Sequence, residues 1–279
     1  MAPRKPPPAA AGGTERIARR IARAGVCSRR AAEALIAEGR VAVDGHAIAS
    51  PALNVGPAEI VTIDGEPIPA AEPPRLWRHH KRRGRITTAR DPEGRPTVFD
   101  DLPAGFPRVI TVGRLDYNSE GLLLLTNDGA LARTLELPAT GWVRRYRVRA
   151  HGRVDEPALS RLAGGATVDG VAYGPVEARL ERTVAANAWL TVALREGRNR
   201  EVRKLMAHLG LEVSRLIRVA FGPFQLGNLP PGAVAEVPAK ALAEQLGHRL
   251  PGLAAPPAPL RPARRKSGAR RHAHRRRAP

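Results

Sequence analysis

The stretch GRLDYNSEGLLLLTNDG, Gly113 to Gly129, places a single carboxylate, Asp116, shortly before a run of four leucines. The leucines predict a buried strand, which leaves the aspartate to be explained. It either shapes a turn, by accepting hydrogen bonds from nearby backbone amides, or works as a nucleophile or base. The second role suits an anionic substrate, because the surrounding chain is rich in arginine and guanidinium groups bind phosphate in bidentate geometry.

The sequence lacks the residue patterns of several other kinds of functional site. The eight histidines are scattered, and the single Cys27 excludes an intrachain disulfide and a cysteine-based zinc site. A partly buried free thiol is the simplest interpretation of Cys27. The chain contains no glycine-rich loop of the Walker or dinucleotide type and no Gly-x-Ser-x-Gly turn. These absences leave a single carboxylate working inside a basic site as the remaining kind of chemistry.

The composition indicates a polyanionic partner. Forty-six lysines and arginines face 26 acidic residues, which gives a formal charge of +20 and a pI near 11.5. Nucleic acid is the commonest polyanion in a cell, and an anionic membrane surface is the alternative. No apolar stretch approaches the roughly 20 residues that span a bilayer, and no signal-peptide pattern opens the chain. We expect a cytoplasmic protein without a membrane partner.

The pattern along the chain predicts an α+β protein in four parts. Residues 1–13 are rich in proline and alanine and indicate a disordered leader. Residues 14–70 form a small domain, and residues 75–250 form a larger one dominated by strands. Residues 251–279 hold nine basic residues between Arg261 and Arg277 and no acidic one, which predicts a disordered tail. This tail acts either as a solubilising appendage or as an RNA-binding arm.

Local signals locate the elements within the two domains. The small domain should hold a helix after Thr14, a second helix capped by Ser28, and strands joined by tight turns at Asp44-Gly45 and Asp64-Gly65. In the larger domain, GLLLLTN should be a central strand and GALARTLE a helix. VRRYRVRA and WLTVALREG should be strands, and NREVRKLMAHLG an amphipathic helix.

The small domain resembles the S4 RNA-binding domain. The stretch RIARRIARAGVCSRRAAEALIAEGRVAVDG, Arg16 to Gly45, carries the resemblance. Its two short helices can pack through apolar residues while their arginines face phosphates. A solvated helical face would explain some of these arginines but not six so close together. The expected RNA contacts are Arg16, Arg19, Arg20, Arg23, Arg29 and Arg30.

The larger domain resembles the pseudouridine synthases that modify ribosomal RNA, in the RsuA/RluB branch. Besides the opening stretch, the resemblance rests on HHKRRGRITTARDPEGRPTVFD, on RRYRV and on EGRNREVRKLMAHLG. An S4 domain joined to a catalytic domain is also the architecture of that branch. The resemblance implies a mixed, mainly antiparallel sheet and a reaction without metal or organic cofactor. In that reaction the bond between N1 of uracil and C1′ of ribose breaks, and the base rotates and rejoins through C5.

The resemblance also implies a catalytic trio. Asp116 is the catalytic aspartate, and Tyr146 stacks on the target base and assists proton transfer. Arg203 pairs with Asp116 and holds it ionised, although by charge alone the adjacent Lys204 competes for this role. In the larger domain we further expect Lys81, Arg114, Arg198 and Arg200 to contact RNA.

The sequence after the aspartate, Tyr-Asn-Ser-Glu, and the basic tail favour an enzyme of the RluB type. This type implies a monomer that acts on a uridine of 23S rRNA near the peptidyl-transferase region, on free RNA or within a pre-ribosomal particle. Two alternatives stay open. One is a 16S rRNA enzyme of the RsuA type, and the other is a ribosome-assembly protein that binds RNA through its S4 domain and performs no chemistry.

Overall fold

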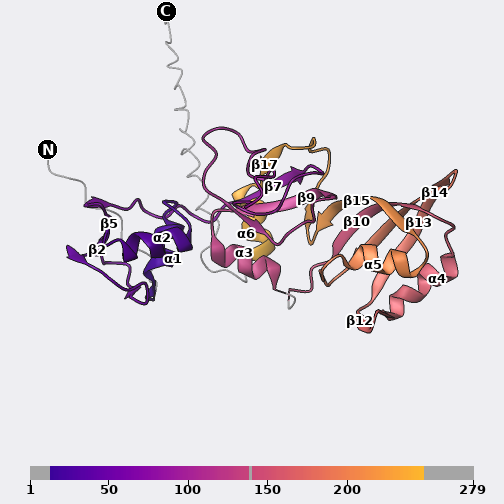
Figure 1. Cartoon of the computed structure of the whole chain (residues 1–279), viewed down its shortest axis with the longest axis horizontal. Coiled ribbons are helices and arrows are strands. Elements are labelled where there is room, and N and C mark those ends of the chain that lie inside the picture. Colours follow the sequence, from indigo (N-terminus) through magenta and orange to yellow (C-terminus); the bar gives the residue numbers. More distant parts are fainter. Residues whose placement is uncertain (1–12, 138–139, 248–279) are drawn as a thin grey trace, which may run out of the picture.

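The computed structural model describes residues 13–137 and 140–247. The expected leader, apart from Gly13, and the expected basic tail lie outside the described residues. Within them, the chain forms an N-terminal unit of two helices and small strands, followed by a larger unit built on one sheet (Figure 1). The expected α+β organisation is confirmed.

The N-terminal unit packs two helices against short hairpins. Its elements are β1 (Glu15–Arg16), α1 (Ile17–Arg23), α2 (Arg29–Ala37), β2 (Val41–Val43), β3 (His46–Ala47), β4 (Asn54–Val55), β5 (Val61–Ile63) and β6 (Glu66–Pro67). Ser28 caps α2 as predicted, because its hydroxyl accepts a hydrogen bond from the amide of Ala31 at 3.1 Å. Asp44 and Asp64 adopt positive φ at the two predicted turns, each followed by glycine, as in hairpin turns of this kind. Ile17, Ile21 and Ile36 are completely buried between helices and strands.

The larger unit is a nine-stranded mixed sheet with the main order β13-β14-β10-β15-β9-β7-β17. Strands β9 and β15 run parallel, and the other paired strands of this sheet are antiparallel. Its strands are β7 (Leu76–Lys81), β8 (Ile110–Val112), β9 (Ser119–Thr126), β10 (Arg144–His151), β13 (Val176–Val184), β14 (Asn187–Leu194), β15 (Glu212–Phe221), β16 (Phe224–Gln225) and β17 (Val234–Glu236). Strands β11 (Ala166–Val168) and β12 (Val171–Tyr173) form a separate hairpin.

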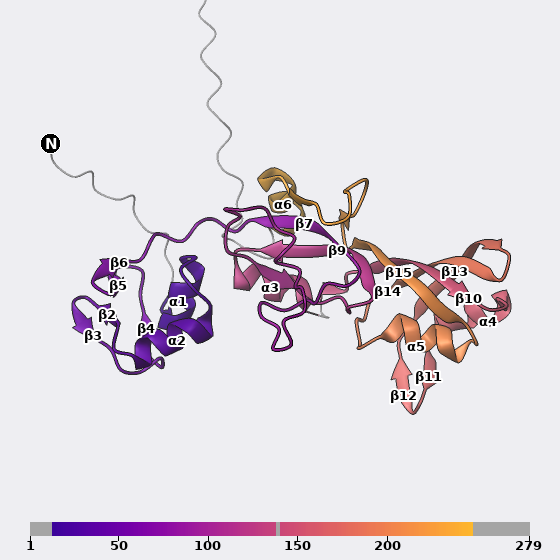
Figure 2. The ribbon, with the colours of Figure 1, turned by 45° about the horizontal axis from the view of Figure 1, so that its top comes forward.

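Helices cover the sheet from different sides. They are α3 (Gly129–Glu136), α4 (Glu156–Arg161), the short 3-10 helix η2 (Leu162–Gly164), α5 (Glu201–His208) and α6 (Ala239–Leu246). Figure 2 shows α3 and α6 beside the β7–β9 half of the sheet, and α4 and α5 beside the β10–β15 half. The helix predicted from GALARTLE is confirmed at the same residues.

The four leucines of β9 lie in the middle of the sheet and are buried on both faces. Leu122 and Leu124 belong to an apolar cluster that includes residues of α3 and α6. Leu123 and Leu125 belong to a second cluster, which includes residues of α4 and α5. Successive side chains of a strand point to opposite faces, so a continuous apolar run is what a strand between two layers requires. Each buried leucine contributes roughly 1.5–3 kcal/mol. The loop that carries Asp116 is therefore attached to one of the most firmly held strands.

None of the helices in the described ranges, 13–137 and 140–247, has the length and apolar character needed to cross a membrane.

Candidate active site

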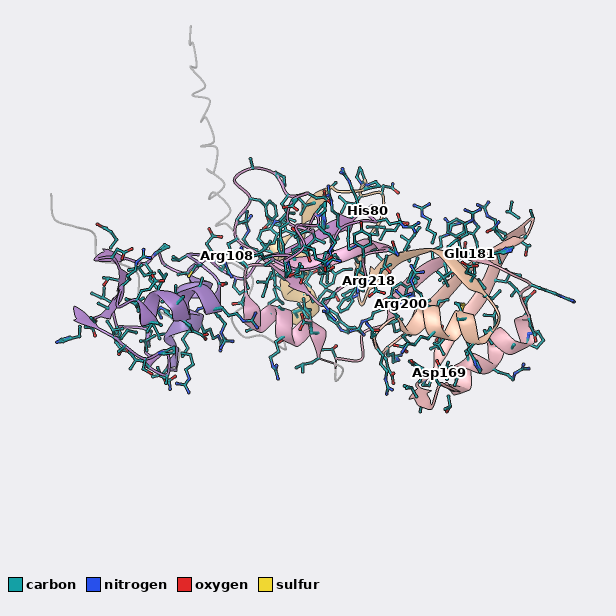
Figure 3. All side chains as sticks on the ribbon, in the orientation of Figure 1. His80, Arg108, Asp169, Glu181, Arg200 and Arg218 are labelled. Carbon is teal, nitrogen blue, oxygen red and sulfur yellow. The ribbon has the colours of Figure 1, made fainter. Side chains whose placement is uncertain are left out.

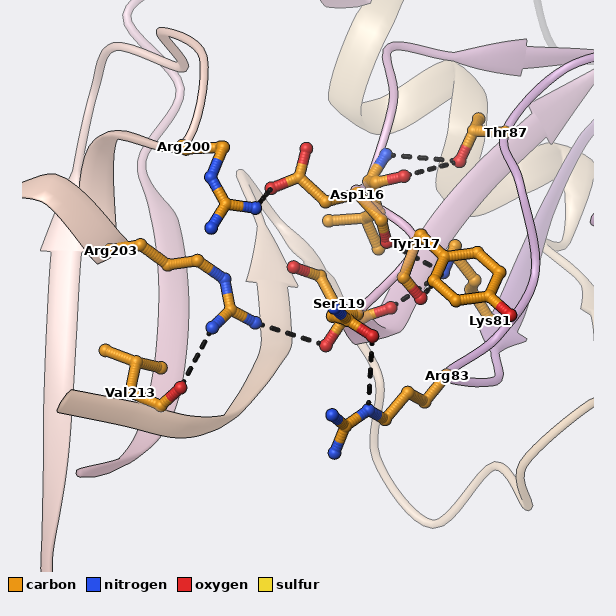
Figure 4. Close-up of polar contacts among 11 residues, drawn as sticks. Lys81, Arg83, Thr87, Asp116, Tyr117, Ser119, Arg200, Arg203 and Val213 are labelled. Carbon is orange, nitrogen blue, oxygen red and sulfur yellow. Dashed lines mark hydrogen bonds and ion pairs between the residues drawn. The ribbon is translucent and has the colours of Figure 1, made fainter. Parts of the chain in front are cut away.

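The loop before β9 is held by the buried ammonium group of Lys81. The Nζ atom donates hydrogen bonds to the main-chain carbonyls of Ser119 at 2.7 Å, Asp116 at 3.0 Å, Arg82 at 3.1 Å and Tyr117 at 3.4 Å. Lys81 is completely buried. Burial lowers the pKa of Lys81 to about 8, although the nearby Asp116 carboxylate opposes the shift. The lysine shapes the loop from within (Figure 4).

Thr87 holds the other end of the same loop. Its hydroxyl donates to the carbonyl of Leu115 at 2.8 Å and accepts from the amide of Leu115 at 3.3 Å. Leu115 itself is buried in the core. With residues on both sides fixed, the Asp116 side chain keeps a defined position while remaining 35% exposed.

Asp116 opens into a cleft of about 550 Å³, a size typical of small-molecule and nucleotide sites. The cleft is formed by the loop before β9, by β10, by the loop before α5 and by β15. Its wall includes Asp116, Tyr146, Arg198, Arg200 and Arg218. Residues more than 100 positions apart in the chain, such as Asp116 and Arg218, thus line the same cleft.

Arg200 is the arginine that faces the aspartate. It directly precedes α5 in the left-handed backbone conformation, with φ 53°, and its Nη1 lies 3.9 Å from Oδ2 of Asp116 (Figure 4). Arg200 was expected to contact RNA and the structure places it in the cleft wall. The side chain is half exposed, so the guanidinium can reach both the carboxylate and a bound ligand.

The expected direct pair between Arg203 and Asp116 is not formed in this structure, although the Asp116 carboxylate is near enough to act on the charge of Arg203. Arg203 lies on α5 itself, and its Nη1 donates to the carbonyl of Val213 at 3.0 Å while its Nη2 donates to the carbonyl of Asn118 at 3.2 Å. The helix directs this side chain to the main chain beneath the Asp116 loop. Burial and the neighbouring Arg200 lower the pKa of Arg203. Lys204, the competing candidate, is exposed.

Tyr146 lies on the cleft-facing side of β10 and is 8% exposed. The predicted strand is confirmed, and its side chains alternate, with Tyr146, Val148 and Ala150 buried. Among the described residues of the cleft wall, the aromatic side chains are Tyr146 and Phe221. Tyr146 therefore supplies one of the two aromatic rings of the cleft wall.

The expected RNA-binding residues divide into three groups. Arg114 and Arg198 line the cleft, as does Arg200. On the N-terminal unit, Arg19 and Arg23 pair with Glu15, and Arg16 and Arg20 donate to main-chain carbonyls, whereas the exposed Arg29 and Arg30 form no ion pair with a described residue. The assignment of Lys81 to RNA contact is wrong, because its completely buried ammonium is already bonded to loop carbonyls.

Sequence reasoning missed two buried charged residues of the cleft, Arg218 and Glu201. Arg218 is 3% exposed on β15, and its Nε donates to the carbonyl of Leu122 at 2.7 Å. Glu201 is also 3% exposed, its Oε2 accepts from the amide of Arg198, and burial raises its pKa. A signal for Arg218 was present, because it lies two residues from Leu216 and from Ala220 and so shares their inward-facing side of the strand.

These residues form a site suited to an anionic ligand, with the Asp116 carboxylate at the centre of the site. Positive charge comes from Arg114, Arg198 and Arg200, and Tyr146 supplies a ring. No group of three histidine, cysteine, aspartate or glutamate side chains suited to a metal ion occurs in the part of the chain that the structure describes. Such a site suits acid–base or nucleophilic chemistry on a nucleotide.

Comparison with known proteins agrees with this arrangement. Residues 78–208 match the family described as RNA pseudouridylate synthase, and residues 15–61 match the S4 domain. A Rickettsia felis protein described as an uncharacterized RNA pseudouridine synthase is 47% identical over 228 residues, which cover 82% of this chain and 99% of that protein. Ribosomal large subunit pseudouridine synthase B is 44% identical in Pasteurella multocida, over 80% of this chain and 67% of that protein. In Salmonella typhi it is 42% identical, over 80% of this chain and 79% of that protein.

A solved structure shares the fold. The crystal structure of a pseudouridylate synthase matches 83% of this chain and 99% of its own chain with a TM-score of 0.58, at 24% sequence identity. The match supports the fold described above. From the relatives above, from the two matched families and from this fold, the chain belongs to the RNA pseudouridine synthases, as an isomerase in which an S4 domain precedes the catalytic domain.

Proposed function

We propose that this chain converts one uridine of 23S ribosomal RNA, in the peptidyl-transferase region, to pseudouridine, with Asp116 as the nucleophile. The observation that carries the proposal is the position of Asp116, a partly exposed carboxylate held at the centre of a cleft lined by arginines. The choice of RNA follows the relatives, which are named as ribosomal large subunit pseudouridine synthases. The enzyme is expected to act as a monomer in the cytoplasm.

The reaction requires a redistribution of bonds without any net gain or loss of atoms. The C1′–N1 bond of the uridine breaks, the base turns within the cleft, and a C1′–C5 bond forms. C5 loses its proton and N1 gains one. Asp116 attacks to generate the detached base and is released when the new bond forms, so no cofactor takes part in the balance.

Other residues of the cleft bind the flipped nucleotide. The Tyr146 ring is expected to stack on the uracil, an interaction worth roughly 1–3 kcal/mol per base. Arg114 and Arg198 contact the phosphates on either side, and Arg200 supplies positive charge beside the carboxylate. Arg203 fixes the main chain beneath the Asp116 loop and so supports the catalytic aspartate indirectly.

The S4 domain supplies additional affinity. Arg29 and Arg30, at the exposed start of α2, are proposed to bind phosphates of the rRNA away from the target base. Such contacts position an RNA without reading its sequence. The choice of uridine then depends on RNA shape, either in free RNA or in a pre-ribosomal particle.

The test is to map the product on both ribosomal RNAs. Purified protein is incubated with protein-free 23S and 16S transcripts and with large-subunit precursor particles, and pseudouridine is located by carbodiimide labelling and primer extension. The proposal expects one new stop in 23S RNA that is lost in Asp116→Asn. The matched control is Asp169→Asn, at an exposed turn with positive φ remote from the cleft, where asparagine is equally tolerated.

Two results would change the assignment. A stop in 16S RNA would keep the reaction and replace the target by that of the RsuA type. Tight RNA binding without any stop, on transcripts and on precursor particles, would favour a ribosome-assembly protein without chemistry.

A further inference from the structure

Arg218 connects the two strands that carry the proposed catalytic residues. In the β10–β15 ladder it is the direct cross-strand partner of Tyr146. On the other side of β15, its Nε donates to the carbonyl of Leu122 in β9, the strand that follows the Asp116 loop. Figure 3 shows Arg218 near the middle of the sheet, close to Arg200 at the start of α5. Arg218 thus lies between the strand that carries Tyr146 and the strand that follows the Asp116 loop.

The position is unfavourable for a cation. Arg218 is 3% exposed, its Nη2 is buried without a hydrogen-bond partner, and no carboxylate among the described residues forms an ion pair with it. Burial lowers the pKa of Arg218, and the hydroxyl of the neighbouring Tyr146 opposes this shift. Burying an unpaired charge costs several kcal/mol, so an apolar residue here would serve stability better. The charge therefore has a purpose other than stability.

Two features of the backbone allow Arg218 to occupy this position. Strand β15 has an irregularity opposite the Arg145–Tyr146 step, which brings Arg218 rather than Val219 opposite the tyrosine. In β9, Gly121 lies against Arg218 with φ +103°, and a Cβ atom there would be 2.3 Å from the Arg218 carbonyl oxygen. The ring of Phe221 lies 5.4 Å from the guanidinium and closes it off on another side.

We propose that Arg218 is a positioning residue, which acts on the isomerisation through the hydroxyl of Tyr146 rather than by touching the RNA. It holds that hydroxyl toward the base and stabilises the negative charge that develops on the oxygen when it exchanges protons with the uracil. C5 gives up one proton and N1 receives one, so the hydroxyl ends with the proton it began with. This inference rests on the proposed function, because it requires that a uridine reacts beside Tyr146.

A double-mutant cycle tests the route through Tyr146. With rRNA containing 5-tritiated uridine, kcat and KM are measured from the tritium released for the full-length wild type, Arg218→Gln, Tyr146→Phe and the double variant. We expect Arg218→Gln to lower kcat about 100-fold, as for loss of acid–base assistance, with KM unchanged. In the Tyr146→Phe background the same change should have no further effect, because the hydroxyl on which Arg218 acts is already absent.

Two further variants separate positioning from folding. Arg218→Lys keeps the charge and should recover a large part of kcat. Arg215→Gln, on the same strand in an exposed ion pair with Glu120, is the matched control and should keep the wild-type kcat. If thermal melting shows that Arg218→Gln does not fold, the cycle is run with Arg218→Met, which keeps a long side chain without the charge.

The outcomes are distinct. The inference would be overturned if the fold-losses in kcat of Arg218→Gln and Tyr146→Phe multiply in the double variant. It would also be overturned if Arg218→Gln changes KM alone. In both cases the proposed function stands. Wild-type protein that releases no tritium from either rRNA, free or in particles, would overturn the proposed function and the inference with it.

Discussion

Arg200 and Asp116 face each other across the cleft, with 3.9 Å between a guanidinium nitrogen and a carboxylate oxygen. The contact depends on the left-handed conformation of Arg200, which turns the chain into α5 at this residue. Arg203, one helical turn further, is directed to the carbonyls of Val213 and Asn118 instead. We therefore expect different tasks for the two arginines, one electrostatic and one structural.

Substitution should separate these tasks. Arg200→Gln should lower kcat by roughly 100-fold if its charge supports the transition state, with little change in melting temperature, because exposed ion pairs contribute at most about 1 kcal/mol to stability. Turnover and thermal melting of the purified variant check this. A wild-type kcat in Arg200→Gln would contradict the electrostatic role.

Arg203→Gln should act through the fold. It leaves two carbonyls beneath the Asp116 loop without their donor, so the free energy of unfolding should fall by about 1–3 kcal/mol. Denaturant titration measures this loss, and Lys204→Gln, its exposed neighbour, is the control. An unchanged midpoint together with lost activity would instead assign Arg203 a direct catalytic role.

The lowered pKa of Lys81 predicts that the reaction slows at alkaline pH. Its pKa of about 8 means that the ammonium loses its proton as the pH rises through about 8. Lys81 then loses its positive charge and one of its N–H donors, although four carbonyl oxygens surround its Nζ atom. The Asp116 loop is therefore held less firmly. Single-turnover rates should therefore fall with a midpoint near pH 8. Lys81→Met should be slow at every pH without this transition, and Lys204→Met should keep the wild-type profile.

Gly121 should tolerate no side chain. Its φ of +103° strains any other residue, and the added Cβ would overlap the Arg218 carbonyl at 2.3 Å. Gly121→Ala should lower the free energy of unfolding by about 3 kcal/mol or more in denaturant titration. Gly164→Ala, with open space around its Cβ, should change it by less than about 0.5 kcal/mol. Equal stability of both variants would mean that β9 and β15 approach each other less closely.

The S4 domain should contribute affinity that depends on salt. Arg29→Gln and Arg30→Gln should each weaken binding to all rRNA sequences alike and reduce the slope of log K against log salt by about 0.7–0.9 for a lost phosphate contact. Arg40→Gln is the control, because that guanidinium already pairs with Asp64 and Glu38. Binding titrations at several salt concentrations measure the slope, and unchanged slopes would exclude these contacts.

The sequence was most informative where structure depends on neighbouring residues. Ser28, Asp44-Gly45 and the Gly129–Glu136 helix could be predicted because caps, turns and helical periodicity are local. The buried strand of four leucines followed from its continuous apolar pattern. Asp116 and Tyr146 needed the resemblance to a family, because an aspartate at a turn and a tyrosine on a strand are ordinary features.

The remaining features depend on contacts between distant residues. The burial of Lys81 depends on carbonyls more than 30 positions away, so its charge wrongly indicated RNA contact. The choice between Arg200 and Arg203 depends on one left-handed residue that no residue type required. Arg218 was recognisable only as a charge in an inward-facing position of an alternating strand.

The most direct test is tritium release from rRNA labelled at C5 of uridine, because isomerisation must detach that hydrogen. We predict that wild-type protein and Asp169→Asn release tritium from 23S RNA, and that Asp116→Asn releases none although it binds the RNA with wild-type affinity. Release by Asp116→Asn at the wild-type rate would contradict the central claim that the Asp116 carboxylate performs the reaction.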